Sequence, residues 1–499
     1  MVAPATSSTL RKWLIPDIAL VLAAITMLYC LISFGGMQQF FRDSDSGWHI
    51  RNGERVLASG QVPQTDPFSF SKPNGAWFAW EWLADCTMAK AHEWDGLRGV
   101  FLLYLGVLGL VTWLWVQLLW TVKTWFLVAA VSAWVMLTTS SIHWLARPHL
   151  YGWVFLLLVV ILCERQSVRL NWKTIFLVFI GSILWANMHA SFFLGTAIFA
   201  LYAGEKWLRG DHASKPLGAC ALVSFAAGFI NPYGWHVHQH IISYLQDKEL
   251  LSRIGEFQTF NFHVDGAEAL VVGLLLVAVG IGLSIEQGNF ARGILCLVLF
   301  TGALRSARGL PLLVLVGLPL ALSSICRAIE NAKGLPSFVR DFANYNANLR
   351  KMDANFRGYA LVPVLLVLFV ITSRSALFSK PTGFPEGTYP VALSAQIEKL
   401  PEDARLFSTD KFGGYLIYRF DGRRKVFFDG RSDYYGADFL KDYLLIPEVK
   451  PGWEVQWNRW NFTHALVPKD STLTEMLPVK GWRQIGKDET AILFEKGSQ

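Results

Sequence analysis

Charged residues are scarce in this sequence of 499 residues. Asp, Glu, Lys and Arg make up 17% of the chain, whereas 53% is hydrophobic and 14% is aromatic. Such a composition cannot give a water-soluble protein of this length a polar surface. The net charge is +7, but the basic residues lie in short segments between apolar runs and form no single patch, which argues against a nucleic-acid partner. The composition predicts a polytopic membrane protein.

Cysteine is also scarce, and no internal repeat or low-complexity tract occurs. The six cysteines lie mostly inside apolar runs and have no CxxC spacing: Cys30, Cys86, Cys163, Cys220, Cys296 and Cys326. We therefore expect neither a zinc site made of cysteines nor a disulfide framework.

Long apolar runs are abundant and predict about eleven crossings of a membrane. They lie near residues 14–35, 97–120, 125–142, 150–163, 174–188, 191–204, 217–230, 268–285, 291–304, 309–326 and 358–373. If the N-terminus is cytoplasmic, the Lys- and Arg-rich connections all fall on the cytoplasmic side, as retained positive charge requires. The first run is too long for a cleaved signal and has no A-x-A site after it, so we expect a retained anchor.

The chain divides, on this topology, into a transmembrane part (1–373) and an extracytoplasmic α/β domain (374–499). In the second part, ARLFST, KVFFDG, HALVP, WRQIG and TAILFE predict strands, and DFLKDYLL and STLTEML predict helices. The basic, Asn-rich segment 327–357 is expected to be an amphipathic surface segment. The expected fold class is therefore a polytopic α-helical membrane protein with a C-terminal α/β domain outside the cytoplasm.

The outer connections concentrate polar and aromatic residues. The first of them, residues 36–96, is far longer than a connector needs. The candidates from all outer connections are Asp43, Asp45, Trp48, His49, Glu81, Arg147, His149, His189, Arg305 and Arg308. Charged groups at membrane depth are costly and are usually paired or functional. We expect Arg147, His149, His189, Arg305 and Arg308 to converge around one cavity next to Asp45, with snorkelling as the alternative for the arginines.

Other polar residues favour structural roles or leave the role open. His236, His238 and His240 alternate, which does not match a zinc site and favours interfacial packing. Asp66 precedes Pro67 and is interpreted as a turn residue. Arg431, in VFFDGRSDYYG, follows a predicted strand, where it would either contact phosphate or acceptor or complete a salt-bridged turn.

Two stretches resemble a known superfamily. DSDSGWHIRNGERVLASGQVPQTDPFSF with WFAWEWL looks like the first outer loop, and GGYLIYRF with VFFDGRSDYYG looks like the tail domain, of bacterial members of the GT-C membrane glycosyltransferases. That superfamily includes the protein O-mannosyltransferases, the aminoarabinose transferase of lipid A and the oligosaccharyltransferases. The resemblance implies a multi-pass protein of the bacterial inner membrane with its active site on the extracytoplasmic side.

The sequence departs from parts of that pattern. Protein mannosyltransferases have adjacent Asp-Glu where this chain has Asp43-Ser44-Asp45, and the WWDYG motif of oligosaccharyltransferases is missing, which disfavours N-glycan transfer. A second acidic motif, which would help to bind a metal in the oligosaccharyltransferases, is replaced by the basic SIHWLARPH. We expect no cofactor, and a divalent metal stays open without support.

The expected reaction moves a sugar from a polyprenyl-phosphate donor to a hydroxyl of a protein, lipid or polysaccharide acceptor, with inversion. Such a transfer needs one base and a cationic patch for the leaving phosphate. Asp45 is the candidate base and Asp43 the second choice, unless both merely cap the helix that follows. Trp48 is available to stack on a sugar ring. The alternatives are a transporter or flippase of lipid or anionic solute, or a non-catalytic envelope assembly protein.

Overall fold

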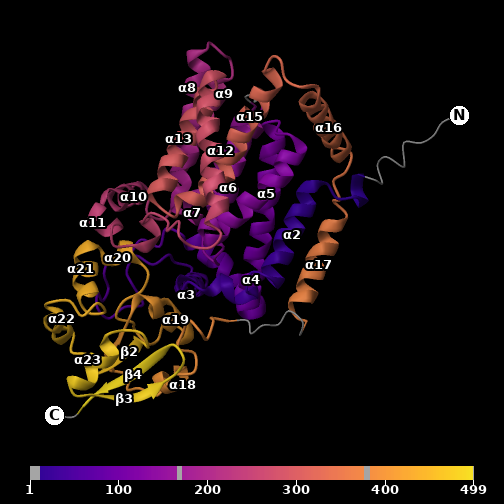
Figure 1. Cartoon of the computed structure of the whole chain (residues 1–499). Helices are drawn as coiled ribbons and strands as arrows, with labels where there is room; N and C mark the ends of the chain where they lie inside the picture. Colours follow the sequence, from indigo (N-terminus) through magenta and orange to yellow (C-terminus); the bar gives the residue numbers. More distant parts are fainter. Residues whose placement is uncertain (1–11, 166–170, 376–382, 498–499) are drawn as a thin grey trace.

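The computed structural model describes residues 12–165, 171–375 and 383–497. Figure 1 shows a bundle of long helices and, at one end of it, a smaller lobe that contains the sheet and the C-terminus. We call this lobe, residues 383–497, the tail lobe, and the end of the bundle that it contacts the site end. The turn between α8 and α9 lies at the opposite end of the bundle.

Eleven apolar segments of the bundle coincide with the eleven predicted runs. They are α2 (Ile18–Ile32), α4 (Trp82–Thr121), α5 (Phe126–Ser140), α6 (His149–Glu164), α7 (Trp172–Met188), α8 (Phe193–Leu208), α9 (Ser214–Ala227), α12 (Ala267–Glu286), α13 (Phe290–Arg305), the continuous segment α14 (Gly309–Leu312), η5 (Leu313–Gly317) and α15 (Leu318–Asn331), and α17 (Leu361–Ser373). Within the described residues, five helical stretches are long and apolar enough to cross a membrane, and further apolar helices are shorter. The polytopic helical fold is confirmed, while the count of eleven crossings stays a prediction.

Two irregularities shape these helices. α4 begins well before the predicted run, at Trp82, and is kinked where Asp95 and Gly96 leave helical dihedral angles; the φ of Gly96 is +56°, which glycine adopts without steric cost. The segment η5 is a π-helix, which shifts the backbone hydrogen bonds locally. The indole of Trp115 donates to the carbonyl of Val314 there, at 3.0 Å. Glycine therefore permits the kink in α4, and a hydrogen bond from Trp115 is made to a backbone carbonyl of the π-helix.

Short elements build the connections of the bundle. At the site end these are η1 (Gly36–Phe41), α3 (Asp45–Ser59), η2 (Ser141–His143), η3 (Ala190–Phe192), α10 (His236–Gln246), α11 (Lys248–Leu251) and η4 (Gly255–Phe257). The expected surface segment forms α16 (Ser337–Asp353), a mostly exposed helix at the side of the bundle.

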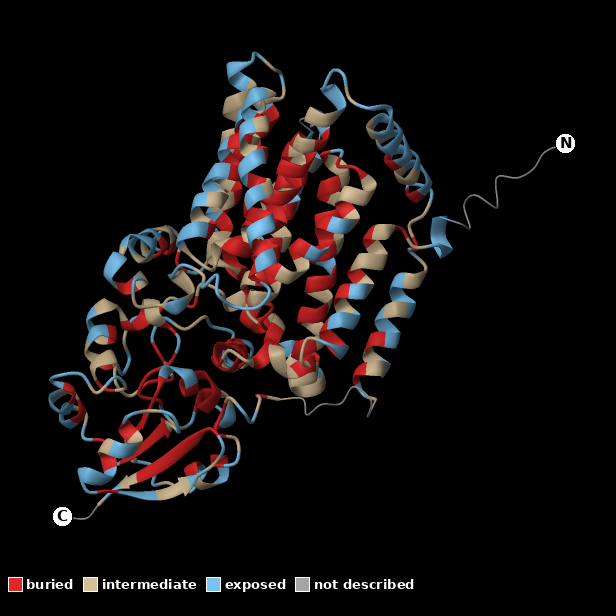
Figure 2. Cartoon of the chain, viewed as in Figure 1, coloured by how far each residue is buried: buried red, intermediate tan, exposed pale blue. Residues whose placement is uncertain are grey.

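The tail lobe contains a four-stranded sheet in the order β1-β2-β4-β3. Its strands are β1 (Leu406–Ser408), β2 (His464–Pro468), β3 (Trp482–Lys487) and β4 (Ala491–Lys496). β1 pairs with β2 in parallel, and the other pairs are antiparallel. The helices around it are α18 (Ser394–Glu398), α19 (Asp410–Arg419), α20 (Ser432–Tyr435), α21 (Ala437–Leu445), α22 (Trp453–Arg459) and α23 (Leu473–Val479). Figure 2 shows that most of the sheet is buried.

One predicted strand is wrong. Among the described residues, KVFFDG forms no strand of the sheet; instead Val426 makes an isolated bridge to Ser69 of the first outer loop. The amide of Val426 donates to the carbonyl of Phe68 at 2.9 Å, and its carbonyl accepts from the amide of Phe70 at 3.0 Å. The apolar stretch is therefore extended, but its partner lies far away in the sequence.

α3 and α19 fix the tail lobe against the first outer loop. A Cβ at Gly47 or at Gly414 would overlap the backbone of the opposite helix, so glycine at both positions permits this close approach. This contact holds the start of α3 at Asp45, together with the preceding Asp43, against the tail lobe.

Candidate active site

Two adjoining cavities lie where the bundle meets the tail lobe. The inner cavity has a volume of about 410 Å³ and opens among bundle helices, where apolar side chains form much of its wall, including Trp153, Leu156, Phe193, Leu194, Leu245 and Leu312. The outer cavity has a volume of about 670 Å³ and extends toward the tail lobe, which contributes Tyr389, Asp410, Lys411, Phe428 and Asp429. Both cavities are lined by Asp45, Arg147, Glu256 and Arg308. A ligand in either cavity would therefore meet the same charged groups.

The two aspartates of the first loop have different positions. The Oδ1 atom of Asp43 accepts the amide of Asp45 at 2.9 Å, so Asp43 satisfies the first amide of α3, whose N-cap residue is Ser44. Asp45 is the first residue of that helix and lines both cavities. A Cβ at Gly430 of the tail lobe would overlap the Asp45 carboxylate. Asp43 thus satisfies an amide at the helix start and lines the outer cavity, whereas Asp45 lines both cavities and lies against Gly430.

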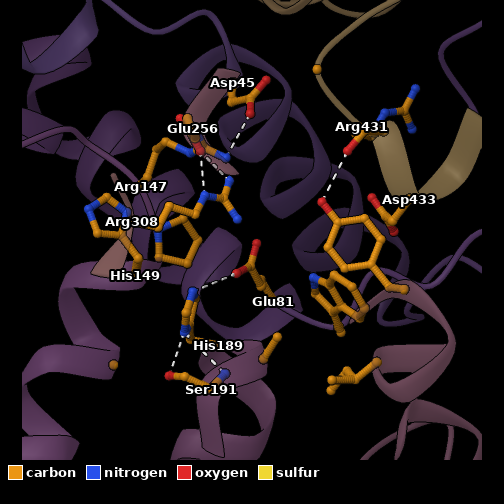
Figure 3. A pocket seen from close by; sticks show the side chains of 18 of the residues that line it. Asp45, Glu81, Arg147, His149, His189, Ser191, Glu256, Arg308, Arg431 and Asp433 are labelled. Atoms are coloured by element: carbon orange, nitrogen blue, oxygen red, sulfur yellow. Dashed lines mark hydrogen bonds and ion pairs between the residues drawn. The ribbon is translucent and has the colours of Figure 1, made fainter. Parts of the chain in front are cut away.

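Arg147 joins the three carboxylates around it. Its guanidinium lies 2.7 Å from Asp43, 2.8 Å from Asp45 and 3.1 Å from Glu256. Glu256 in turn accepts from the Nε of Arg308 at 2.5 Å (Figure 3). Burial alone would raise the pKa of Glu256, but Arg147 and Arg308 together hold that pKa well below its usual range.

The charge state of Asp45 differs from the expectation. A base at the membrane surface is expected to lie near water and to stay ionised at neutral pH, but Asp45 is only 5% exposed. Burial and the neighbouring Asp43 raise the pKa of Asp45 to about 7, against the lowering effect of Arg147. A carboxyl with this pKa can accept a proton near neutral pH.

Several predicted residues lie together at the inner cavity: Trp48, Glu81, Arg147, His149, His189 and Arg308. The Nε2 atom of His149 donates to the carbonyl of His143 at 2.7 Å. His189 Nε2 lies 3.6 Å from Glu81. The indole of Trp48 stacks on the ring of His49, with centroids 3.6 Å apart. Their roles in binding stay predictions, but one cavity brings them together.

Two predicted binding residues, Arg305 and His49, are not among the described residues that line the two cavities. Arg305 is exposed at the end of α13 and, within the described chain, lines neither cavity, so it is the arginine for which snorkelling fits. His49 is fully buried behind Trp48 and contacts Asp85 at 2.6 Å. It therefore cannot contact a ligand directly.

Arg431 is the third correction. Although it borders the inner cavity, its guanidinium points away (Figure 3) and is 2.7 Å from Asp66 and 2.7 Å from Asp429. The Arg431 side chain is 1% exposed, and the guanidinium is stacked among aromatic rings that include Trp77 at 4.7 Å. Arg431 thus joins the tail lobe to the first loop and is not free to bind phosphate or acceptor. Asp66 is more than a turn residue, because it forms this ion pair with Arg431 and also accepts hydrogen bonds from the amides of Phe68 and Ser69.

Two functional positions were not predicted. Glu256, in IGEFQTF, links Arg147 to Arg308, and among the four acids of the outer connection 231–266 nothing in the sequence distinguished it. Asp85 lies one turn inside α4 and contacts His49 and Asn52, and its sequence context, WLADC, gave no sign of these partners.

A divalent metal does not fit this donor set. The described residues contain no group of three His, Cys, Asp or Glu side chains arranged to hold a metal ion. The position between Asp43, Asp45 and Glu256 is filled by the guanidinium of Arg147. The positive charge at this point is supplied by an arginine.

Solved structures share the fold. The oligosaccharyltransferase AglB of the archaeon Archaeoglobus fulgidus, in complex with an inhibitory peptide and a dolichol-phosphate, matches with a TM-score of 0.59 and 14% identity over 90% of this chain and 69% of that one. The Archaeoglobus fulgidus oligosaccharyltransferase tethered with an acceptor peptide matches with a TM-score of 0.54 and 13% identity, over 90% and 68%. ArnT from Cupriavidus metallidurans, bound to undecaprenyl phosphate, gives 0.49 and 13%, over 99% and 100%.

The chain therefore has the GT-C fold of membrane glycosyltransferases, and the resemblance noted in the sequence is confirmed at the level of fold. No protein-family model matches the chain, and no curated protein matches it.

Proposed function

We propose that the protein is a membrane glycosyltransferase that moves a sugar from a polyprenyl-phosphate donor to an acceptor hydroxyl on the extracytoplasmic side of a bacterial inner membrane. The observation that carries the proposal is the position of Asp45, a buried carboxyl shared by an inner cavity with a largely apolar wall and an outer cavity at the tail lobe. The lipid-linked donor fits the inner cavity, and the acceptor fits the outer one. The GT-C fold supports this assignment.

In the proposed step, an acceptor hydroxyl in the outer cavity attacks the anomeric carbon of the donor, and Asp45 takes the hydroxyl proton. The bond between the anomeric carbon and the phosphate oxygen breaks, and the lipid phosphate leaves as an anion. Entry of the acceptor from the side opposite the phosphate gives inversion. Asp43 serves this step by satisfying the first amide of α3 and by sharing Arg147.

The leaving phosphate needs positive charge at the rim of the inner cavity. Arg308 suits this role because its side chain is 39% exposed, whereas that of Arg147 is 17% exposed and bound to three carboxylates. His189 borders the same cavity and can donate a hydrogen bond from Nε2 to a phosphate oxygen, because its Nδ1 accepts from the amide of Ser191.

Transfer by the purified protein tests the proposal. Protein in lipid nanodiscs is incubated with undecaprenyl phosphate that carries a radiolabelled sugar, together with a membrane extract as acceptor. The proposal expects label to move to an acceptor or, without acceptor, to be released slowly by water. Movement of the intact lipid across vesicles without cleavage would instead identify a flippase, and neither cleavage nor movement would fit an assembly protein.

A further inference from the structure

Glu81 is a second carboxyl group at the inner cavity, and the proposed transfer step gives it no role. Glu81 precedes α4 and borders the inner cavity, and its side chain is 13% exposed. Figure 3 shows it between His189 on one side and the arginines on the other. Two ring nitrogens face its oxygens: His49 Nε2 at 3.8 Å and His189 Nε2 at 3.6 Å. Both distances exceed a hydrogen bond, so the carboxyl keeps bonding capacity for a ligand.

A chain of buried groups fixes the first of these histidines. The Nδ2 of Asn52 donates to Asp85 at 2.6 Å, and the other Asp85 oxygen lies 2.6 Å from Nδ1 of His49. A Cβ at Gly53 would overlap the Asp85 backbone, so glycine lets α3 and α4 approach closely enough for these contacts. The Nε2 of His49 is buried and has no hydrogen-bond partner among the described residues, and it faces Glu81. A buried nitrogen without a partner is costly and calls for an explanation.

The second histidine presents a donor. The amide of Ser191 donates to Nδ1 of His189 at 3.2 Å, so the proton of a neutral His189 is on Nε2, the atom that faces Glu81. If the Nδ1 of His49 donates to Asp85, the Nε2 of His49 presents an acceptor. A neutral carboxylic acid at Glu81 matches both, with its hydroxyl toward His49 and its carbonyl oxygen toward His189.

We propose that Glu81 binds a hydroxyl of the donor's sugar ring in the inner cavity and that His49 and Asp85 are positioning residues that hold it for this contact. The inference rests on the proposed function and adds the part of the donor that the cavity recognises. Trp48, which also borders the cavity and stacks on His49, offers an aromatic surface to the sugar ring.

The charge state of Glu81 agrees with this geometry. Burial, with a further contribution from Asp85, raises the pKa of Glu81 to about 8, so the acid is mostly neutral at pH 7 and does not repel the donor phosphate. The titratable and charged groups that face it are His49, Asp85, Arg147, His189, Arg308 and Asp433. Above pH 8 the ionised form would oppose binding of a phosphate in the same cavity.

Direct binding separates recognition of the sugar from recognition of the phosphate. The probes are undecaprenyl phosphate and undecaprenyl phosphate carrying glucose, mannose or galactose, measured with wild-type protein and with Glu81→Gln, Glu81→Ala and Asp85→Asn in nanodiscs at pH 6.5 and 9. At pH 6.5 we expect the wild type to bind the lipid that carries its preferred sugar more tightly than the bare lipid. Glu81→Gln should keep this advantage, and Glu81→Ala should lose about tenfold, the equivalent of one hydrogen bond. Asp85→Asn should reduce the advantage while leaving the affinity for bare lipid unchanged.

Lipid binding at the two pH values tests the charge of Glu81 independently. At pH 9 the wild type should bind the bare lipid more weakly than at pH 6.5, and Glu81→Gln should show less of this loss. The inference is overturned if Glu81→Ala keeps the full sugar advantage, or if Asp85→Asn weakens both lipids equally, as a purely structural role would. Thermal unfolding identifies variants that fail to fold, and Glu81→Gln is the conservative member of the set. If wild-type protein binds neither lipid, the proposed function itself fails and this inference with it.

Discussion

Replacing Asp45 by Asn removes the proposed base while changing little else. The neutral amide cannot take the acceptor proton, so we expect turnover to fall by a factor of about 10² to 10⁴, equivalent to roughly 3 to 5 kcal/mol in the barrier. The structural cost should be smaller. Arg147 keeps Asp43 and Glu256, and the loss of one charge-assisted hydrogen bond costs at most about 1.5–3 kcal/mol.

Asp17→Asn is the matched control. Asp17 is also a buried aspartate at a helix start: it caps α2 through the amide of Leu20 at 3.0 Å and pairs with Arg357 at 3.4 Å, away from both cavities. Both variants are compared by thermal unfolding and by transfer of labelled sugar from the lipid donor. Only Asp45→Asn should lose turnover.

The wild-type pH profile adds a second measurement of the same group. Because burial raises the pKa of Asp45 to about 7, the rate should rise with pH through that region as the basic form appears. A folded Asp45→Asn protein with wild-type turnover would show that Asp45 is not the base.

Three further changes test the surroundings of the site. Arg308→Ala should raise the KM for the lipid donor about tenfold or more, while Arg305→Ala, which alters an exposed side chain, should leave steady-state kinetics unchanged. Arg431→Met should destabilise the protein by about 3–5 kcal/mol, because it leaves two buried carboxylates without their cation; equal melting temperatures would contradict this. Gly430→Ala should reduce turnover with little change in donor binding, since the added Cβ would displace the Asp45 carboxylate; unchanged kinetics would show that the loop moves aside freely.

Much of the fold follows from local features of the sequence. Apolar runs predict the bundle because each helix must satisfy its own backbone in lipid. Costly charges at membrane depth likewise predict Arg147 and Arg308, which do face the cavities. What the sequence could not show are contacts between distant segments. Glu256 pairs with both Arg147 and Arg308, and KVFFDG pairs with the first loop instead of the sheet. Arg431 has the charge of a phosphate ligand but finds Asp66, 365 positions away.

The ion pair between Arg431 and Asp66 also constrains how the chain is threaded through the membrane. Two residues in direct contact must lie on the same side, so the chain between positions 66 and 431 crosses the bilayer an even number of times. The rule is independent of the distribution of Lys and Arg and of the exact length of any helix. A single added or deleted crossing between these positions would place Gly430 on the opposite side from Asp45 and divide the site between two compartments. Evolution of this chain can therefore add or remove spans in that region only in pairs.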